Sequence, residues 1–241
     1  MSPRGDRPRI PADGGYLALT AFFVAFLLVS DIIAVKLVPV GLGPWQALVP
    51  AGVIAYPFTF LAADVLTEVY GIEAARRTIW LGFGSAAAMV LLLLAAVALP
   101  ASPAGAPQSA FGRILGQTPR IVLGSFAGYL AGELSNAQVM AAMRRLTRGR
   151  ALWSRTIGST VVGQALDTSI FITIAFTAFP ALGVAGVPVA QVGVIIVSQY
   201  AVKVLVEVVG TPLVYAVVGW LRRPAWERAD AIFAAPAALR D

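Results

Sequence analysis

Eight ionisable side chains lie within apolar stretches of this sequence, where charges are costly. They are Asp31, Asp64, Glu68, Glu133, Asp167, Glu207, Lys36 and Lys203. A charge at the centre of a bilayer costs about 2.5–3.5 kcal/mol on insertion scales. Two lysines can neutralise at most two of the six acids, so at least four carboxylates must be protonated, reach water or accept other hydrogen bonds. This cost favours a functional role, in which the acids accept a ligand or carry protons.

The position of each charge along its apolar stretch indicates whether it lies near a membrane surface or near the middle of the bilayer. Asp31 falls in the second half of its stretch, and Lys36 and Glu68 fall near the ends of theirs. Lys36 could extend its side chain to the membrane surface, and Glu68 could lie at the interface. These explanations account for the two residues as well as a functional role does. The groups nearest the middle are those for which a purely structural role is least expected: Glu133, Asp167, Lys203 and Glu207.

Polar and aromatic residues recur at helical spacing on four of the apolar stretches. The sets are Tyr56, Phe60, Asp64 and Glu68; Ser125, Tyr129, Glu133 and Asn136; Thr160, Gln164, Asp167 and Phe171; and Gln199, Lys203 and Glu207. Residues three or four apart share one helix face, and polar faces turn to the interior of a membrane bundle. We therefore expect one shared cavity, whose carboxylates and amides suit an N–H-rich ligand and whose aromatic rings suit a flat one.

The stretches themselves are long enough to cross a membrane. Of the 241 residues, 59% are hydrophobic and 12% are charged, and the mean hydropathy is +0.81. Each apolar segment is near or above the roughly 20 residues that span a bilayer core. The segments are 16–38, 47–69, 79–100, 121–143, 156–179 and 192–220. The sequence thus predicts an all-α integral membrane protein, a six-transmembrane-helix bundle over residues 16–221, between a disordered N-terminal tail (1–15) and a C-terminal tail (222–241).

The distribution of arginine predicts the orientation of this bundle. In a six-span topology, 14 of the 18 basic residues fall on one side of the membrane. Basic residues concentrate on the cytoplasmic side, so both termini are expected there. The net charge of +6 is then a topology signal, and no nucleic-acid partner is needed to explain it.

Composition also limits the chemistry. The chain contains neither cysteine nor histidine, which excludes thiol catalysis and the commonest metal ligand. The Y-D and G-x-G-D motifs of intramembrane aspartyl proteases are missing as well. We therefore predict a protein that is not an enzyme and that uses no cofactor and no metal.

Four blocks of the sequence resemble the queuosine precursor transporter family, also called the VUT family. They are YPFTFLAADVLTEVYGIEAARRTIW, RIVLGSFAGYLAGELSNAQVMAAM, LWSRTIGSTVVGQALDTSIFITIAF, and Lys203 with Glu207 followed by TPLVYAVVGWL. The family's D-x-x-x-E-x-Y-G falls on Asp64, Glu68, Tyr70 and Gly71; its G-E-x-x-N on Gly132, Glu133 and Asn136; and its G-S-T-x-x-x-Q/E-x-x-D on Gly158, Ser159, Thr160, Gln164 and Asp167.

The resemblance implies an inner-membrane importer of 7-deazaguanine compounds, such as 7-cyano-7-deazaguanine and its aminomethyl relative, for salvage into the tRNA base queuosine. Alternating access driven by a secondary gradient is the expected mechanism. The expected substrate-binding residues are Glu133 and Asp167 first, with Asn136, Gln164, Asp64, Tyr56 and Phe60. The residues expected to act in coupling or gating are Glu68, Lys203, Glu207 and Asp31, with Lys203 and Glu207 compensating each other one turn apart.

Other readings stay open. The substrate-binding subunit of an energy-coupling-factor importer has a similar size and helix number, and another small nitrogenous solute would suit the same cavity. A non-transporting scaffold, whose buried charges are satisfied by partners, is a further alternative, and the sequence leaves open whether the protein is a homo-oligomer. Small-xxx-small spacing predicts close helix packing at five glycines: Gly82, Gly84, Gly124, Gly128 and Gly132.

Overall fold

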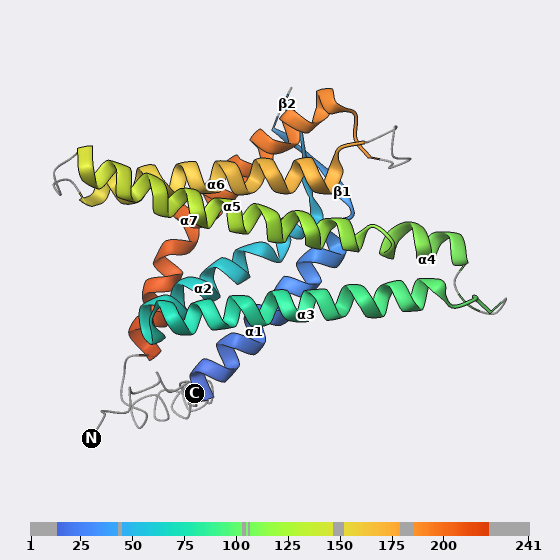
Figure 1. Ribbon diagram of the computed structural model, residues 1–241, viewed down its shortest axis with the longest axis horizontal. Coiled ribbons are helices and arrows are strands. Elements are labelled where there is room, and N and C mark those ends of the chain that lie inside the picture. Colours follow the sequence, from blue (N-terminus) through green and yellow to red (C-terminus); the bar gives the residue numbers. More distant parts are fainter. Residues whose placement is uncertain are drawn as a thin grey trace, which may run out of the picture.

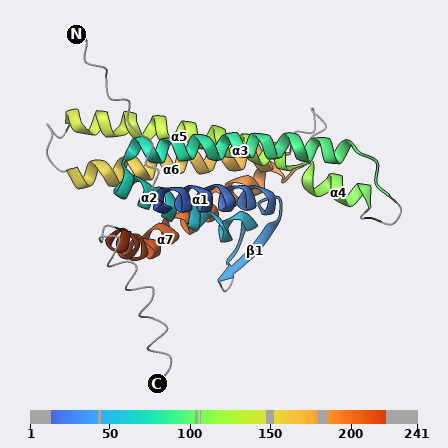
Figure 2. The same ribbon diagram turned by 90° about the horizontal axis from the view of Figure 1, so that it is seen from below.

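Helices dominate the computed structural model of the protein, which describes residues 14–42, 45–102, 105, 107–146, 152–178 and 186–221. The helices are α1 (Gly14–Ile33), α2 (Tyr56–Tyr70), α3 (Ile72–Ala98), α4 (Gln108–Leu115), α5 (Thr118–Leu146), α6 (Leu152–Phe176) and α7 (Val189–Leu221). Figures 1 and 2 show α3, α5 and α6 along the long axis of the molecule, with α1, α2 and α7 on the other side of that layer. The site described below lies where these two sets of helices meet.

Three stretches are long and apolar enough to cross a membrane: α1, α3 and residues Val189–Gly210 of α7. Leu91 and Leu92 on α3 are 69% and 72% exposed, as expected for side chains that face lipid rather than water. The described residues thus confirm a helical membrane protein. The number of six crossings and the cytoplasmic location of the termini stay predictions, and most of both predicted tails lies outside the described residues.

A β-hairpin replaces the predicted end of the first span and start of the second. Strands β1 (Leu37–Leu42) and β2 (Trp45–Pro50) pair antiparallel, and a short 3₁₀ helix, η1 (Ala51–Ile54), leads on to α2. The prediction was wrong here because hydropathy does not distinguish an apolar strand from an apolar helix. Proline and glycine in LVPVGL and WQALVP disfavour a helix. Leu37 and Leu48 pack against the buried cluster formed by α5, α6 and α7, so the hairpin closes one end of the helix assembly.

The start of α2 also differs from expectation. Pro57 is not in the middle of a helix, where it would free a carbonyl, but in the first turn of α2, where its missing N–H costs nothing. Tyr56 therefore lies at the beginning of the helix, and its carbonyl accepts a hydrogen bond of 2.7 Å from the Thr59 hydroxyl. At the other end, Gly71 has φ +85°, a conformation that allows the direct turn from α2 into α3.

Glycines bring α5 and α6 together along their length (Figure 1). A Cβ atom at Gly124 would lie 3.0 Å from the Phe171 carbonyl oxygen, and one at Gly128 would lie 2.6 Å from that of Asp167. These distances, with the similar crowding at Gly132 and Gly82, confirm close packing at four of the five predicted glycines. The prediction was wrong for Gly84, because nothing lies within 4 Å of a Cβ atom there.

Candidate ligand-binding site

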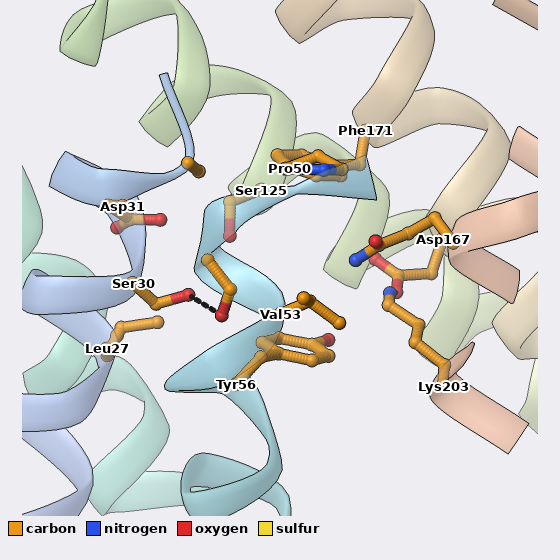
Figure 3. A pocket seen from close by; sticks show the side chains of 13 residues that line it. Leu27, Ser30, Asp31, Pro50, Val53, Tyr56, Ser125, Asp167, Phe171 and Lys203 are labelled. Atoms are coloured by element: carbon orange, nitrogen blue, oxygen red, sulfur yellow. Dashed lines mark hydrogen bonds and ion pairs between the residues drawn. The ribbon is translucent and has the colours of Figure 1, made fainter. Parts of the chain in front are cut away.

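A cavity lies between α1, η1, α2, α5, α6 and α7, with about 440 Å³ of empty space when the open solvent at its mouth is included. Figure 3 shows Asp31 at one end of it and the side chains of Asp167 and Lys203 at the other, with Val53 and Tyr56 between them. Its polar lining consists of Ser30, Asp31, Tyr56, Ser125, Asp167, Gln199 and Lys203. Carboxylates, an amide, hydroxyls and an ammonium group thus surround one space. Tyr56, Ser125, Asp167, Gln199 and Lys203 come from the sets with helical spacing, whereas Ser30 and Asp31 do not.

An ion pair closes one end of this cavity. The Lys203 Nζ donates to Asp167 Oδ2 over 2.5 Å, and only 3% of the lysine side chain and 18% of the aspartate side chain are exposed. The same ammonium lies 4.7 Å from the centre of the Tyr56 ring, within the range of a cation–π contact. The pair neutralises two of the eight costly charges and joins α6 to α7. The partner that the structure gives Lys203 is therefore on a neighbouring helix, whereas the sequence predicted Glu207 on the same one.

The packing of α5 determines where the Asp167 carboxylate can sit. A Cβ atom at Gly128 would lie 2.7 Å from Asp167 Oδ1, and one at Gly132 would lie 3.0 Å from Asp167 Cβ. These two glycines leave the room that the aspartate occupies. The close approach of α5 and α6 is thus part of the site as well as of the fold.

The opposite end of the cavity holds a carboxylate without such a partner. Asp31 is 6% exposed and lines the cavity, and no side chain or backbone group in the described part of the chain forms a hydrogen bond or ion pair with its carboxylate. Its neighbour Ser30 donates to the Gly52 carbonyl oxygen over 3.2 Å, which ties α1 to η1 beside it. Gln199, 3% exposed, also lines the cavity, and its Oε1 has no hydrogen-bond partner among the residues that the structure describes.

A second cavity adjoins the first, with about 520 Å³ of empty space when open solvent is included. It is more aromatic: the rings of Tyr56 and Phe60 stack edge to face at 4.4 Å, and those of Phe83 and Tyr129 lie 5.2 Å apart. The two cavities share four lining residues, which are Leu27, Tyr56, Ser125 and Asp167. A solute that moved from one cavity to the other would therefore pass Asp167 and Tyr56.

The sequence of this chain matches a known family of proteins. A family model described as "Putative vitamin uptake transporter" matches residues 50–217, well over half of the chain. The chain belongs to the vitamin uptake transporter (VUT) family. The match covers three of the four blocks that carry the predicted resemblance and most of the fourth, so the resemblance is confirmed.

Three curated relatives of this VUT protein are named as transporters. The chain is 33% identical over 167 residues to the "Probable queuosine precursor transporter" of Bacillus subtilis, a match that covers 68% of this chain and 69% of the relative. It is 30% identical to the "Queuosine precursor transporter" of Escherichia coli, over 54% of this chain and 56% of the relative. The protein of Haemophilus influenzae, named "Probable queuosine precursor transporter", is 30% identical over 52% of this chain and 51% of its own. No solved structure matches the chain significantly.

The predicted site residues of this VUT protein fall into three groups. Those on the first cavity are Asp31, Tyr56, Asp167 and Lys203, and Phe60 lies on the second. The residues that line neither of these two cavities are Glu133, Asp64, Glu68 and Gln164, of which the first three are exposed. The side chains of Asn136 and Glu207 lie outside the described part of the structure.

Sequence reasoning missed Ser30, Gly52 and Val53, which also line the first cavity. Gly52 and Val53 belong to η1, in a stretch that was expected to be a transmembrane helix. The one available signal was Ser30 next to Asp31, since two adjacent polar residues near a helix end indicate contact with something other than lipid.

Proposed function

We propose that this protein imports 7-deazaguanine precursors of queuosine across the inner membrane. Membership of a transporter family and the names of three relatives support transport and the substrate class. The observation that carries the proposal is the cavity, in which Asp31, Asp167 and Gln199 provide acceptors beside the aromatic rings of Tyr56 and Phe171. A flat bicyclic solute with several N–H groups matches this lining.

Secondary transport by alternating access is part of the proposal. The two adjoining cavities meet at Tyr56 and Asp167, so a change that opens one while closing the other would move a solute past these residues. The N–H groups of the ligand would compete with Lys203 for the Asp167 carboxylate. Weakening of an ion pair that joins α6 to α7 would couple binding to movement of these two helices.

The test is uptake of labelled 7-cyano-7-deazaguanine by cells that neither synthesise nor import queuosine precursors, with queuosine in tRNA as a second readout. The expected result is uptake that depends on this protein. Purified protein in liposomes distinguishes the mechanism: transport by the chain alone supports a secondary transporter, whereas a need for ATPase subunits supports the energy-coupling-factor alternative. Failure of both assays at normal membrane levels of the protein would overturn the proposal.

Two carboxylates predicted to contact ligand provide a comparison within this assay. Asp167 lines both cavities, whereas Glu133 is exposed and lines neither. Loss of a hydrogen bond to a charged group costs about 1.5–3 kcal/mol, or roughly 10- to 150-fold in affinity. We expect Asp167→Asn to lower uptake at least about tenfold and Glu133→Gln to have the smaller effect. Normal uptake by both variants at equal expression would remove both from the site.

A further inference from the structure

Asp31 is a buried carboxylate that forms no hydrogen bond or ion pair in the described fold, and the proposed function uses it only as one of several acceptors in the cavity. It is 6% exposed, it lines the first cavity, and its carboxylate has no hydrogen-bond or ion-pair partner in the described ranges. The two lysines of the apolar stretches do not neutralise it. Lys203 donates to Asp167 at the far end of the cavity (Figure 3), and Lys36 is exposed beyond the end of α1.

A packing role does not account for this side chain. The wall around Asp31 includes the apolar residues Leu27 and Ala34, and an aliphatic residue at position 31 would continue that wall without the cost of a buried charge. The backbone near Asp31 is fixed by other contacts, because the Ser30 hydroxyl reaches the Gly52 carbonyl oxygen. Both acceptor oxygens of Asp31 are thus held beside the cavity and are not used by any residue that the structure describes.

We infer that Asp31 is the specificity-determining residue of this site and that it binds the N–H edge of a fused 2-aminopyrimidinone ring. This inference rests on the proposed function and names the group of the substrate that is recognised. The ring N–H and the exocyclic amino group of such a solute point in the same direction, and one carboxylate accepts both in a bidentate pair. Asp31 accepts them without displacing a cation, whereas Asp167 would first have to release Lys203.

A ligand whose one edge is bound to Asp31 would extend from there into the middle of the cavity. Tyr56 lies between Asp31 and the Asp167–Lys203 pair (Figure 3), where its ring lines the space that a flat solute would fill. Gln199 Oε1, which also has no partner within the described ranges, belongs to a residue that lines the same cavity from α7. A solute bound to Asp31 by one edge would therefore have a second, neutral acceptor for an N–H group elsewhere on its rings.

This geometry predicts discrimination by the exocyclic amino group. A site built to accept a hydrogen bond rejects an analogue that lacks the donor, because its own buried acceptor is then left without a partner. The test is competition for uptake of labelled 7-cyano-7-deazaguanine by unlabelled 7-deazaguanine and by 7-deazahypoxanthine, which lacks the amino group. We expect the unaltered protein to prefer 7-deazaguanine by at least about tenfold.

Asp31→Asn replaces one acceptor oxygen with a donor and leaves the size of the side chain unchanged. We expect the KM for the labelled precursor to rise at least about tenfold and the preference for 7-deazaguanine to fall to within about threefold. Asp31→Glu, which keeps the carboxylate, is expected to keep the preference. Glu73→Gln makes the same kind of change in an exposed pair with Arg76 outside the site, and it serves as the control with unchanged uptake.

The possible results separate this inference from the proposed function. Normal KM and preference in Asp31→Asn would overturn the role of Asp31 and leave the importer intact. Loss of accumulation with unchanged preference would also overturn it, because Asp31 would then carry protons instead of ligand. Absence of uptake by the unaltered protein would overturn the proposed function and this assignment with it. If Asp31→Asn does not reach the membrane, the same comparison is made with Asp31→Ser.

Discussion

Each end of the first cavity has a carboxylate, but only one of the two carboxylates forms an ion pair in the described structure. Asp167 has Lys203 at 2.5 Å and a glycine-lined wall of α5 against it, whereas Asp31 lines the cavity with no partner among the described residues. We call these the paired end and the unpaired end. The comparison teaches that a buried carboxylate can serve stability and ligand binding together, as at the paired end, or ligand binding alone. Substitutions at the two ends should therefore separate the free energy of unfolding from transport.

The largest effect on stability is expected from Lys203→Met at the paired end. The variant leaves the Asp167 carboxylate without its cation in a buried position, and breaking a buried pair on one side costs about 3–5 kcal/mol. The free energy of unfolding of the purified protein in detergent is the measurement. The double variant Lys203→Met with Asp167→Leu is the control, and it should recover most of the stability but not the uptake. A single variant as stable as the unaltered protein would show that the pair does not form.

Gly128→Ala should have the next largest effect, through the wall of the paired end. The new Cβ atom would lie 2.6–2.7 Å from two oxygen atoms of Asp167, so either α5 moves or the carboxylate does. Overpacking of this kind costs about 1–3 kcal/mol, and uptake should fall with stability. Gly84→Ala is the matched control, because the space there is open and alanine is the better helix former by about 0.5–1 kcal/mol. Equal stability of the two variants would contradict the role of the glycines.

The paired end also shows what the sequence could and could not predict. Hydropathy and helical spacing identified the apolar helices and the polar faces that carry Asp167 and Lys203. They did not identify the pair, because residues one turn apart on one helix are visible in the sequence and contacts between helices depend on how each helix is rotated about its axis. The glycine spacing on α5 was the only indication that α6 lies close enough for Asp167 to be held there.

The unpaired end was less predictable for a different reason. Its wall includes η1, which follows a hairpin of largely apolar strands, and an apolar strand is not distinguished by hydropathy from the membrane helix predicted in its place. Asp31 was therefore expected to act in gating near the end of a longer span. The charge count did show that several acids must lack a lysine, but burial and the cavity were needed to show that Asp31 is one of them.

Asp31→Asn should change stability much less than the substitutions at the paired end. No bond within the described structure is lost, and a neutral amide is less costly to bury than a carboxylate. We expect the free energy of unfolding to stay within about 1 kcal/mol of the original value or to increase, although uptake falls. Asp167→Asn is the comparison, since it removes the partner of Lys203. Destabilisation of Asp31→Asn by as much as Asp167→Asn would mean that the two ends do not differ.

Gln199→Met should give the smallest change in the free energy of unfolding. It tests whether an unpaired polar group at the paired end also binds the ligand. Gln199 is on α7 one turn before Lys203, and its buried Oε1 has no partner in the described part of the chain. The paired end therefore also contains an acceptor that no described residue uses. Methionine fills a similar volume and removes that unsatisfied oxygen, so stability should be unchanged or rise by up to about 1 kcal/mol. If the ligand uses the oxygen, the KM rises about two- to tenfold, the effect of one neutral hydrogen bond.

Gln191→Met, on the exposed first turn of α7, is the matched control for this change and should alter neither quantity. A destabilised Gln199→Met with normal KM would show that the amide supports the fold. A stable Gln199→Met with a raised KM would show that the ligand binds the buried polar groups that have no partner among the described residues. This would hold at both ends of the cavity. The difference between paired and unpaired groups would then hold for individual polar groups and not for whole ends of the cavity. Lys203 and Asp167 would differ from the other polar groups because they form an ion pair with each other.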